Sequence, residues 1–160
     1  MSIFKHIVVF FILFFISACE MGNKEAITEK EIIIPQYINI LFVTQPSCPS
    51  CDKLEKTMNL AKPKELIENY FKIKKLYLGE KFPDSLLPLP NGTPTVYFLG
   101  SNNEPLVEPI VGEKTETELL EYLNDAIYEF SVIYGVKIEK LKAQRDAKEN
   151  NETNLSKTTI

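Results

Sequence analysis

The sequence predicts an α/β protein whose central mixed β-sheet is flanked by helices. A segment rich in β-forming residues, Tyr37–Thr44, runs directly into a helical pattern, and a second strand pattern follows, as in a parallel β-α-β unit. Two further strand patterns lie close together in the sequence and precede an amphipathic helix, which indicates an antiparallel hairpin and a closing helix. The predicted order is therefore strand, helix, strand, strand, strand, helix.

The first half of the predicted domain contains one strand and its crossover helices. Tyr37–Thr44 (YINILFVT) is predicted to be a buried strand that ends before Pro46. A helix is predicted from Pro49, because a proline in the first helical turn lacks only an N–H that would be unpaired anyway. Pro63 is predicted to open another short helix for the same reason.

The second half contains three strands, a long loop and a helix. Phe71–Leu78 (FKIKKLYL) alternates as a strand does, and Gly79–Gly92 is a long loop with three prolines. Loops of this length in a small domain are often functional. Thr95–Leu99 and Pro105–Val111 are predicted to be strands, and Thr115–Phe130 an amphipathic helix.

The two ends of the chain differ from this domain. The helical pattern weakens beyond Ser131 and is interrupted at Gly135, and the residues from Lys142 to Ile160 are polar and predicted to be disordered. A mostly polar and charged segment ahead of the domain suits a tether. The predicted divisions are a signal peptide at 1–18, a lipidated N-terminus and tether at 19–31, the α/β domain at 32–130, and a helical extension with a disordered polar tail at 131–160.

The N-terminal segment has the pattern of an export signal. Lys5 and His6 precede a wholly apolar run, Ile7–Ile16, which is shorter than the roughly 20 residues that a membrane-spanning helix needs. The two small residues and the cysteine that follow, ending at Cys19, resemble the lipobox of bacterial lipoproteins, in which the signal is cleaved and the cysteine carries diacylglycerol. This resemblance implies an exported domain, anchored by lipid to a bacterial membrane and facing the periplasm or the cell exterior. The alternatives are an ordinary signal peptide with a chance cysteine, and an uncleaved anchor.

Length and charge narrow the possible functions. The chain has 160 residues, enough for one ordinary domain and its appendages. Its net charge is −4 at pH 7, and no basic stripe with interleaved aromatic residues is present. These features argue against a nucleic-acid partner.

Cys48 and Cys51, three residues apart, are the candidate functional residues. A structural zinc site needs about four ligands. The only histidine, His6, lies in the segment to be cleaved, and the only other cysteine, Cys19, is predicted to be lipidated. A purely structural disulfide between residues this close would close a very small loop and add little stability. A redox pair is therefore favoured, and no metal is expected.

Thiol–disulfide exchange requires this spacing at the start of a helix. Unpaired N–H groups and the helix dipole at that position favour a thiolate over a thiol, so Cys48 is predicted to be the attacking thiolate. Cys51, one turn into the helix, is close enough to attack the mixed disulfide and release the reduced partner. The Cys48–Cys51 pair would then be the redox centre, with no added cofactor.

Three motifs together resemble the thioredoxin fold over about residues 37–130. They are a strand followed by Cys48-Pro49-Ser50-Cys51, a Thr93-Pro94 segment followed by a strand, and Val111-Gly112 followed by a helix. The resemblance implies that the peptide bond before Pro94 is cis and lies beside the active-site disulfide, and that Thr93 and Pro94 dock the extended backbone of a substrate. It also implies that Pro49 and Ser50 in the active-site loop tune the reduction potential.

The sequence departs from cytoplasmic thioredoxins at two positions. Ser47 stands where those proteins have a tryptophan, and Phe42 where they have a buried aspartate; the chain has no tryptophan at all. Without that carboxylate, the proton of Cys51 must be removed by water or by another group such as a glutamate. The resemblance is closer to exported thioredoxin-like proteins.

The direction of electron flow is predicted from the residues around the cysteines. Without a neighbouring histidine, the site lacks one group that strongly stabilises a thiolate, which favours a low reduction potential. Thr93 also resembles the threonine found in periplasmic isomerases and reductases. We therefore predict a reductase that acts on protein thiols and disulfides and exchanges electrons with a membrane donor or acceptor. The alternatives are an oxidant that donates disulfides, and a non-redox binding or assembly module, which would not need both thiols.

Overall fold

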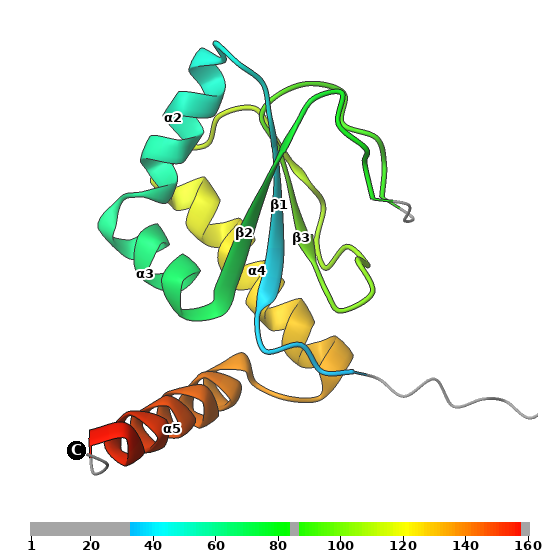
Figure 1. Ribbon diagram of the computed structural model, residues 1–160. Coiled ribbons are helices and arrows are strands. Elements are labelled where there is room, and N and C mark those ends of the chain that lie inside the picture. Colours follow the sequence, from blue (N-terminus) through cyan, green and yellow to red (C-terminus); the bar gives the residue numbers. More distant parts are fainter. Residues whose placement is uncertain (1–32, 84–86, 158–160) are drawn as a thin grey trace, which may run out of the picture. The chain divides into compact units, whose positions relative to one another are not determined.

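Four strands form one mixed sheet in the computed structural model, which describes residues 33–83 and 87–157 (Figure 1). The strands are β1 (Ile38–Thr44), β2 (Phe71–Tyr77), β3 (Thr95–Leu99) and β4 (Ile110–Val111), in the spatial order β2-β1-β3-β4. β1 pairs parallel with β2 and antiparallel with β3, and β3 pairs antiparallel with β4. The predicted parallel start and antiparallel hairpin are both confirmed.

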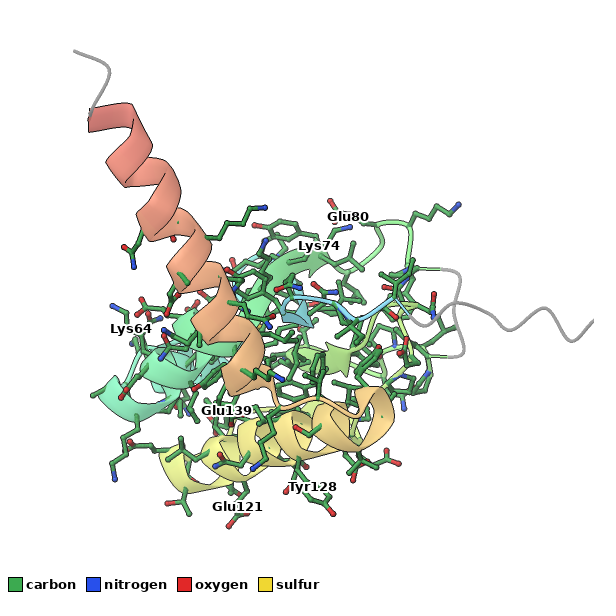
Figure 2. The ribbon with its side chains drawn as sticks, turned by 90° about the horizontal axis from the view of Figure 1, so that it is seen from below. Lys64, Lys74, Glu80, Glu121, Tyr128 and Glu139 are labelled. Carbon is green, nitrogen blue, oxygen red and sulfur yellow. A yellow bond between two sulfur atoms is a disulfide. The ribbon has the colours of Figure 1, made fainter. Side chains whose placement is uncertain are left out.

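The described residues contain four helices, which flank this sheet. They are α2 (Pro49–Met58), α3 (Ala61–Tyr70), α4 (Glu116–Tyr134) and α5 (Ile138–Lys157). α2 and α3 form the crossover that allows β1 and β2 to be parallel. α4 begins with a capping box at Thr115 and Glu118 and packs its apolar side against the core, while Glu121 and Tyr128 point away from it (Figure 2). The predicted α/β class is confirmed.

The helices gather on one face of the sheet, and the loop between β2 and β3 covers part of the other (Figure 1). Alternate residues of β1 point to opposite faces. Ile40 and Phe42 join the larger core, to which all four helices contribute. Leu41 and Val43 point to the second face, where Leu87 from the loop packs on them. Because of this alternation, the carboxyl end of β1 lies between two buried layers. The candidate site comes directly after this end of β1 along the chain.

Several element boundaries differ from the predictions in the domain: α4 continues to Tyr134, beyond the predicted end at Phe130, and two other differences involve prolines. α3 begins at Ala61, so Pro63 lies within its first turn rather than at its start. The predicted strand Pro105–Val111 is a strand only at Ile110–Val111, with an isolated bridge between Pro105 and Leu99. Proline has no N–H to donate, so Pro105 and Pro109 prevent a continuous ladder over this segment.

The predicted disordered tail is wrong over most of its length, because α5 is helical from Ile138 to Lys157. Ile138 and Leu141 are buried in the larger core, and strong helix formers follow them. Arg145 then fastens the helix to the domain by donating hydrogen bonds to the carbonyl oxygens of Gln36 and Asn69. Composition alone suggested disorder, but these tertiary contacts stabilise the helix.

The predicted signal peptide (1–18) and tether (19–31), including Cys19, lie outside the described residues. Within the part of the chain that the structure describes, no helix is both long enough and apolar enough to cross a membrane.

Candidate functional site

Cys48 lies at the N-terminus of α2, just after the carboxyl end of β1. It is the N-cap residue, with extended backbone (φ −105°, ψ 96°), and Pro49 occupies the first helical position. The backbone N–H of Cys51 donates to Cys48 Sγ at 3.2 Å, where an oxygen usually caps a helix. The backbone carbonyl of Cys48 accepts the first helical hydrogen bond, from the N–H of Asp52 at 3.1 Å. The helix N-terminus is thus arranged around the sulfur of Cys48.

Cys48 and Cys51 form a disulfide. Their Cα atoms are 5.2 Å apart. The exposed fractions are 6% for Cys48 and 2% for Cys51, so Cys51 is the more deeply buried of the two. Pro49 is exposed and Ser50 is half-buried, so the turn between the cysteines faces solvent. Both cysteines are thus buried, and their roles as attacking and resolving residue stay a prediction.

The segment before β3 lies against the disulfide. Thr93 Oγ1 is 3.5 Å from Cys48 Sγ. Because a disulfide sulfur carries no hydrogen, the Thr93 hydroxyl is the donor in this state. The Thr93–Pro94 peptide bond is cis, as the resemblance implied. The structure therefore brings the Cys48–Cys51 pair together with Thr93 and Pro94, which lie more than 40 residues further along the chain.

Two hydrogen bonds hold this segment in place, and a third joins α2 to the loop that follows β4. Thr95 Oγ1 donates to the carbonyl of Gly92 at 2.7 Å, which closes the turn around Thr93. The N–H of Gly112, just after β4, donates to the carbonyl of Pro94 at 2.9 Å. Gly112 has φ +76°, in the left-handed region that favours glycine, and this explains the glycine in the Val111-Gly112 motif. Thr57 Oγ1 of α2 donates to the carbonyl of Lys114 at 3.0 Å, so α2 is tied to the same loop.

The hydrogen-bond donors that the described residues place at Cys48 Sγ are neutral, and Lys53 of the same helix is paired with a carboxylate. The donors are the Cys51 N–H and the Thr93 hydroxyl. Lys53 of α2 forms an ion pair with Glu113 at 3.0 Å, across the loop that follows β4. A cationic neighbour would stabilise a thiolate more strongly than a neutral donor does.

Phe42, in β1, has an exposed fraction of 1%. It shares the larger core with Cys51. Directly across from it in the sheet register is Lys75 of β2, whose Nζ lies 5.9 Å from the centre of the Phe42 ring. Lys75 forms an ion pair with Glu55 of α2 at 2.8 Å. Neither Glu55 nor Lys75 was among the site residues predicted from the sequence.

One of these two residues could have been found from the sequence. Glu55 is four residues after Cys51, and residues four apart share one side of a helix. Lys75 could not have been found in this way. Its place next to Phe42 depends on the parallel register of β1 and β2, which local sequence patterns do not specify.

Known proteins resemble this chain in structure rather than in sequence. Neither a protein-family model nor a curated protein sequence matches the chain. Among solved structures, the chain is similar to the solution structure of a thioredoxin from Thermus thermophilus, with 19% sequence identity and a TM-score of 0.43, over 55% of this chain and 72% of that one. The thioredoxin-like fold rests on the topology itself, in which the strand order is β2-β1-β3-β4 and the disulfide opens the helix that follows β1. A cysteine pair in this position is suited to thiol–disulfide exchange.

Proposed function

We propose that this protein is an exported, lipid-anchored thiol–disulfide oxidoreductase that reduces disulfides in other exported proteins. The observation that carries the proposal is the Cys48–Cys51 disulfide at the N-terminus of α2, with the hydroxyl of Thr93 3.5 Å from Cys48 Sγ. Cys48 is the residue that attacks, Cys51 the residue that resolves, and Thr93 and Pro94 form the surface on which a substrate backbone docks. The redox centre is the disulfide itself, without an added cofactor.

The reaction moves two electrons from the protein to its substrate. In the reduced protein, the Cys48 thiolate attacks one sulfur of the substrate disulfide, and the other substrate sulfur leaves as a thiolate that takes up a proton. Cys51 loses its proton and attacks Cys48 Sγ. The Cys48–Cys51 disulfide forms, and the second substrate sulfur leaves as a thiolate and is protonated in turn. A membrane electron donor then returns the protein to the dithiol.

The neutral surroundings of Cys48 support the reducing direction. A strongly oxidising protein owes its high potential to a reduced form whose thiolate is exceptionally stable. Here Cys48 Sγ accepts hydrogen bonds from a backbone N–H and a threonine hydroxyl. The only histidine of the chain, His6, belongs to the predicted signal peptide. The reduced form is therefore less stabilised, and the potential correspondingly low.

The reduction potential tests the direction. The domain from about Met21 is equilibrated with dithiothreitol or glutathione buffers, and the fraction of Cys48–Cys51 disulfide is measured. We expect a value close to about −270 mV, as in thioredoxin. A value near about −120 mV would make the protein an oxidant that donates disulfides.

Substitution of the cysteines tests whether the function is redox chemistry at all. Cys48→Ser is expected to abolish reduction of a protein disulfide such as those of insulin. Cys51→Ser is expected to accumulate a mixed disulfide between Cys48 and the substrate, which non-reducing electrophoresis detects. If Cys48→Ser leaves the function in cells intact, the protein is a binding or assembly module instead.

Metabolic labelling tests the anchor. Bacteria that express the full chain are supplied with radiolabelled palmitate, and label is expected in the wild-type protein but not in Cys19→Ser. If the wild-type protein is instead unlabelled and is found in a soluble exported fraction, the N-terminal segment is an ordinary signal peptide and the protein has no lipid anchor.

A further inference from the structure

Cys51 lies in apolar surroundings, although its proton must leave during the proposed reaction. Its exposed fraction is 2%, and it belongs to the same buried cluster as Phe42 and Leu54. Apolar surroundings disfavour a thiolate relative to a thiol. A group close to Cys51 that accepts the proton as the sulfur attacks would therefore accelerate the resolving step.

Glu55 lies one turn along the same helix. Residues four apart on a helix have Cβ atoms about 5–6 Å apart. Cys51, Leu54 and Met58 mark the buried side of α2, and Glu55 lies at the margin of that side, with a side chain 36% exposed. It lines a cavity of about 300 Å³, together with Phe42 and Met58. Its carboxylate thus borders both the buried side of α2 and solvent.

Lys75 holds this carboxylate beside β1. Its Nζ donates to both carboxylate oxygens of Glu55, at 2.8 Å each. Lys75 is the β2 neighbour of Phe42 in the sheet register and lines the same cavity. The ion pair therefore keeps the Glu55 carboxylate close to Phe42. Phe42 is a position of β1 that itself carries no acidic side chain.

Other charged groups approach Glu55 from α2 and from α3. Lys64 and Glu68 of α3 line the same cavity and form an ion pair with each other at 3.7 Å. Asp52 and Lys56 of α2 share a second, more exposed hollow with Glu55. Substitution of Glu68 therefore removes a charge from the same cavity as substitution of Glu55 does, but on a different helix.

We propose that Glu55 accepts the proton of Cys51 in the resolving step and that Lys75 positions the Glu55 carboxylate, an inference that rests on the proposed thiol–disulfide exchange. The Cys51 thiol gives its proton to the carboxylate, directly or through one water molecule. The sulfur electron pair forms the bond to Cys48 Sγ, and the bond from Cys48 to the substrate breaks. The substrate sulfur leaves as a thiolate, and Glu55 passes the proton to it or to solvent. The dithiol is oxidised, and the substrate disulfide is reduced.

Stopped-flow reaction with dithiobis(nitrobenzoate) separates the two steps. The reduced protein releases one coloured thiolate when Cys48 attacks and a second when Cys51 resolves the mixed disulfide. In Glu55→Gln, the second release is expected to slow roughly 10- to 100-fold at and below neutral pH, since general base catalysis contributes at least this much. The difference shrinks as the pH rises, because hydroxide can then remove the proton. The first release is expected to stay within about twofold of wild type, because it needs no proton from Cys51.

Three further variants distinguish proton transfer from a change in charge or packing. Glu68→Gln removes the same charge from the same cavity and is expected to leave both releases unchanged. Glu55→Asp is expected to recover most of the second rate, and Lys75→Gln to slow it less than Glu55→Gln does. A wild-type second rate in Glu55→Gln at every pH, or an equal slowing in Glu68→Gln, would overturn the inference. If the wild-type protein itself gives no second release, the proposed exchange reaction fails instead.

Discussion

At the scale of single residues, Cys48 Sγ depends on two hydrogen-bond donors that come from different parts of the chain. The N–H of Cys51 belongs to the same helix turn, whereas the hydroxyl of Thr93 comes from the segment before β3. When the disulfide is reduced and Cys48 becomes a thiolate, the same two donors can stabilise the charge. Thr93 thereby links the attacking sulfur to the surface on which a substrate is proposed to dock.

Removal of the Thr93 hydroxyl tests this link. Thr93→Val keeps the size and branching of the side chain but deletes the donor, so we expect slower attack by Cys48. The expected loss is about tenfold, since a hydrogen bond to a charged group contributes about 1.5 kcal/mol or more. The rate of Cys48 alkylation by iodoacetamide at pH 7 measures it. Thr93→Ser keeps the hydroxyl and should react like wild type; equal rates in Thr93→Val and wild type would show that the donor is unimportant.

At the scale of elements, the end of α4 holds the turn between β3 and β4. The hydroxyl of Tyr134 accepts a hydrogen bond from the N–H of Ser101 at 2.7 Å and donates one to Glu104. The second carboxylate oxygen of Glu104 accepts from the N–H of Asn102 at 2.7 Å. Gly100 leaves room for this arrangement, because a Cβ there would overlap the Glu104 carboxylate and the Tyr134 hydroxyl.

The hydrogen bonds at this turn shift the pKa of both groups. Burial alone would raise the pKa of Glu104, but hydrogen bonds from Tyr134 and from backbone N–H groups together lower it below its ordinary value of 4.5. Burial, followed by the hydrogen bond to Glu104, raises the pKa of Tyr134. Because the folded state lowers the pKa of Glu104, this carboxylate contributes stability above its unfolded pKa and loses that contribution as the pH falls through the folded pKa.

Tyr134→Phe tests the contribution of this turn. At pH 7 we expect the variant to be less stable than wild type by about 1.5–3 kcal/mol, the range for a hydrogen bond to a charged group. The difference should narrow as the pH is lowered from about 5 towards 3, where Glu104 becomes protonated in the unfolded and then in the folded state. Urea unfolding across this range measures it. Tyr128→Phe, on the exposed side of the same helix, is the matched control; a Tyr134→Phe difference that does not change with pH would contradict the linkage.

At the scale of the whole domain, α5 and the start of β1 are joined at the end of the sheet opposite the cysteines. Arg145 donates to the carbonyl oxygens of Gln36 and Asn69, and its guanidinium carbon lies 3.9 Å from the centre of the Tyr37 ring. Lys72 Nζ lies 4.4 Å from the same ring centre. β1 then spans seven residues, or roughly 23 Å at the usual rise per residue, before the chain reaches the candidate site. The Arg145 contacts, which stabilise the fold, therefore lie at the opposite end of β1 from the candidate site.

Arg145→Ala separates these two roles. Loss of its hydrogen bonds and of its contact with the Tyr37 ring is expected to lower stability by about 1–3 kcal/mol. The reduction potential and the rate of attack by Cys48 should stay as in wild type, because the site is remote. Urea unfolding and the alkylation assay measure the two properties. Lys148→Ala, an exposed cation on the same helix, serves as the control, and a changed potential in Arg145→Ala would refute the separation.

Local sequence patterns were sufficient to predict much of the fold and the cysteine pair of this protein. The alternation in β1, the apolar periodicity of α4 and the three-residue spacing of Cys48 and Cys51 each lie within a few turns or strand residues. Backbone geometry therefore relates them to structure almost directly. Such patterns led to the α/β class, the strand order along the chain and the cysteine pair at a helix N-terminus, and the structure confirms all three.

Contacts between distant segments could be settled only by the tertiary structure. Composition predicted disorder beyond Lys142, yet Arg145 stabilises α5 through partners 109 and 76 residues away in sequence. Thr93 and Cys48 are 45 residues apart in the sequence, and their contact could be predicted only from the resemblance to a known family. The pairing of Glu55 with Lys75 beside Phe42 depends on the register of two parallel strands and on how α2 packs across them. Register and packing are chosen by the whole core at once, so no short stretch of sequence specifies them.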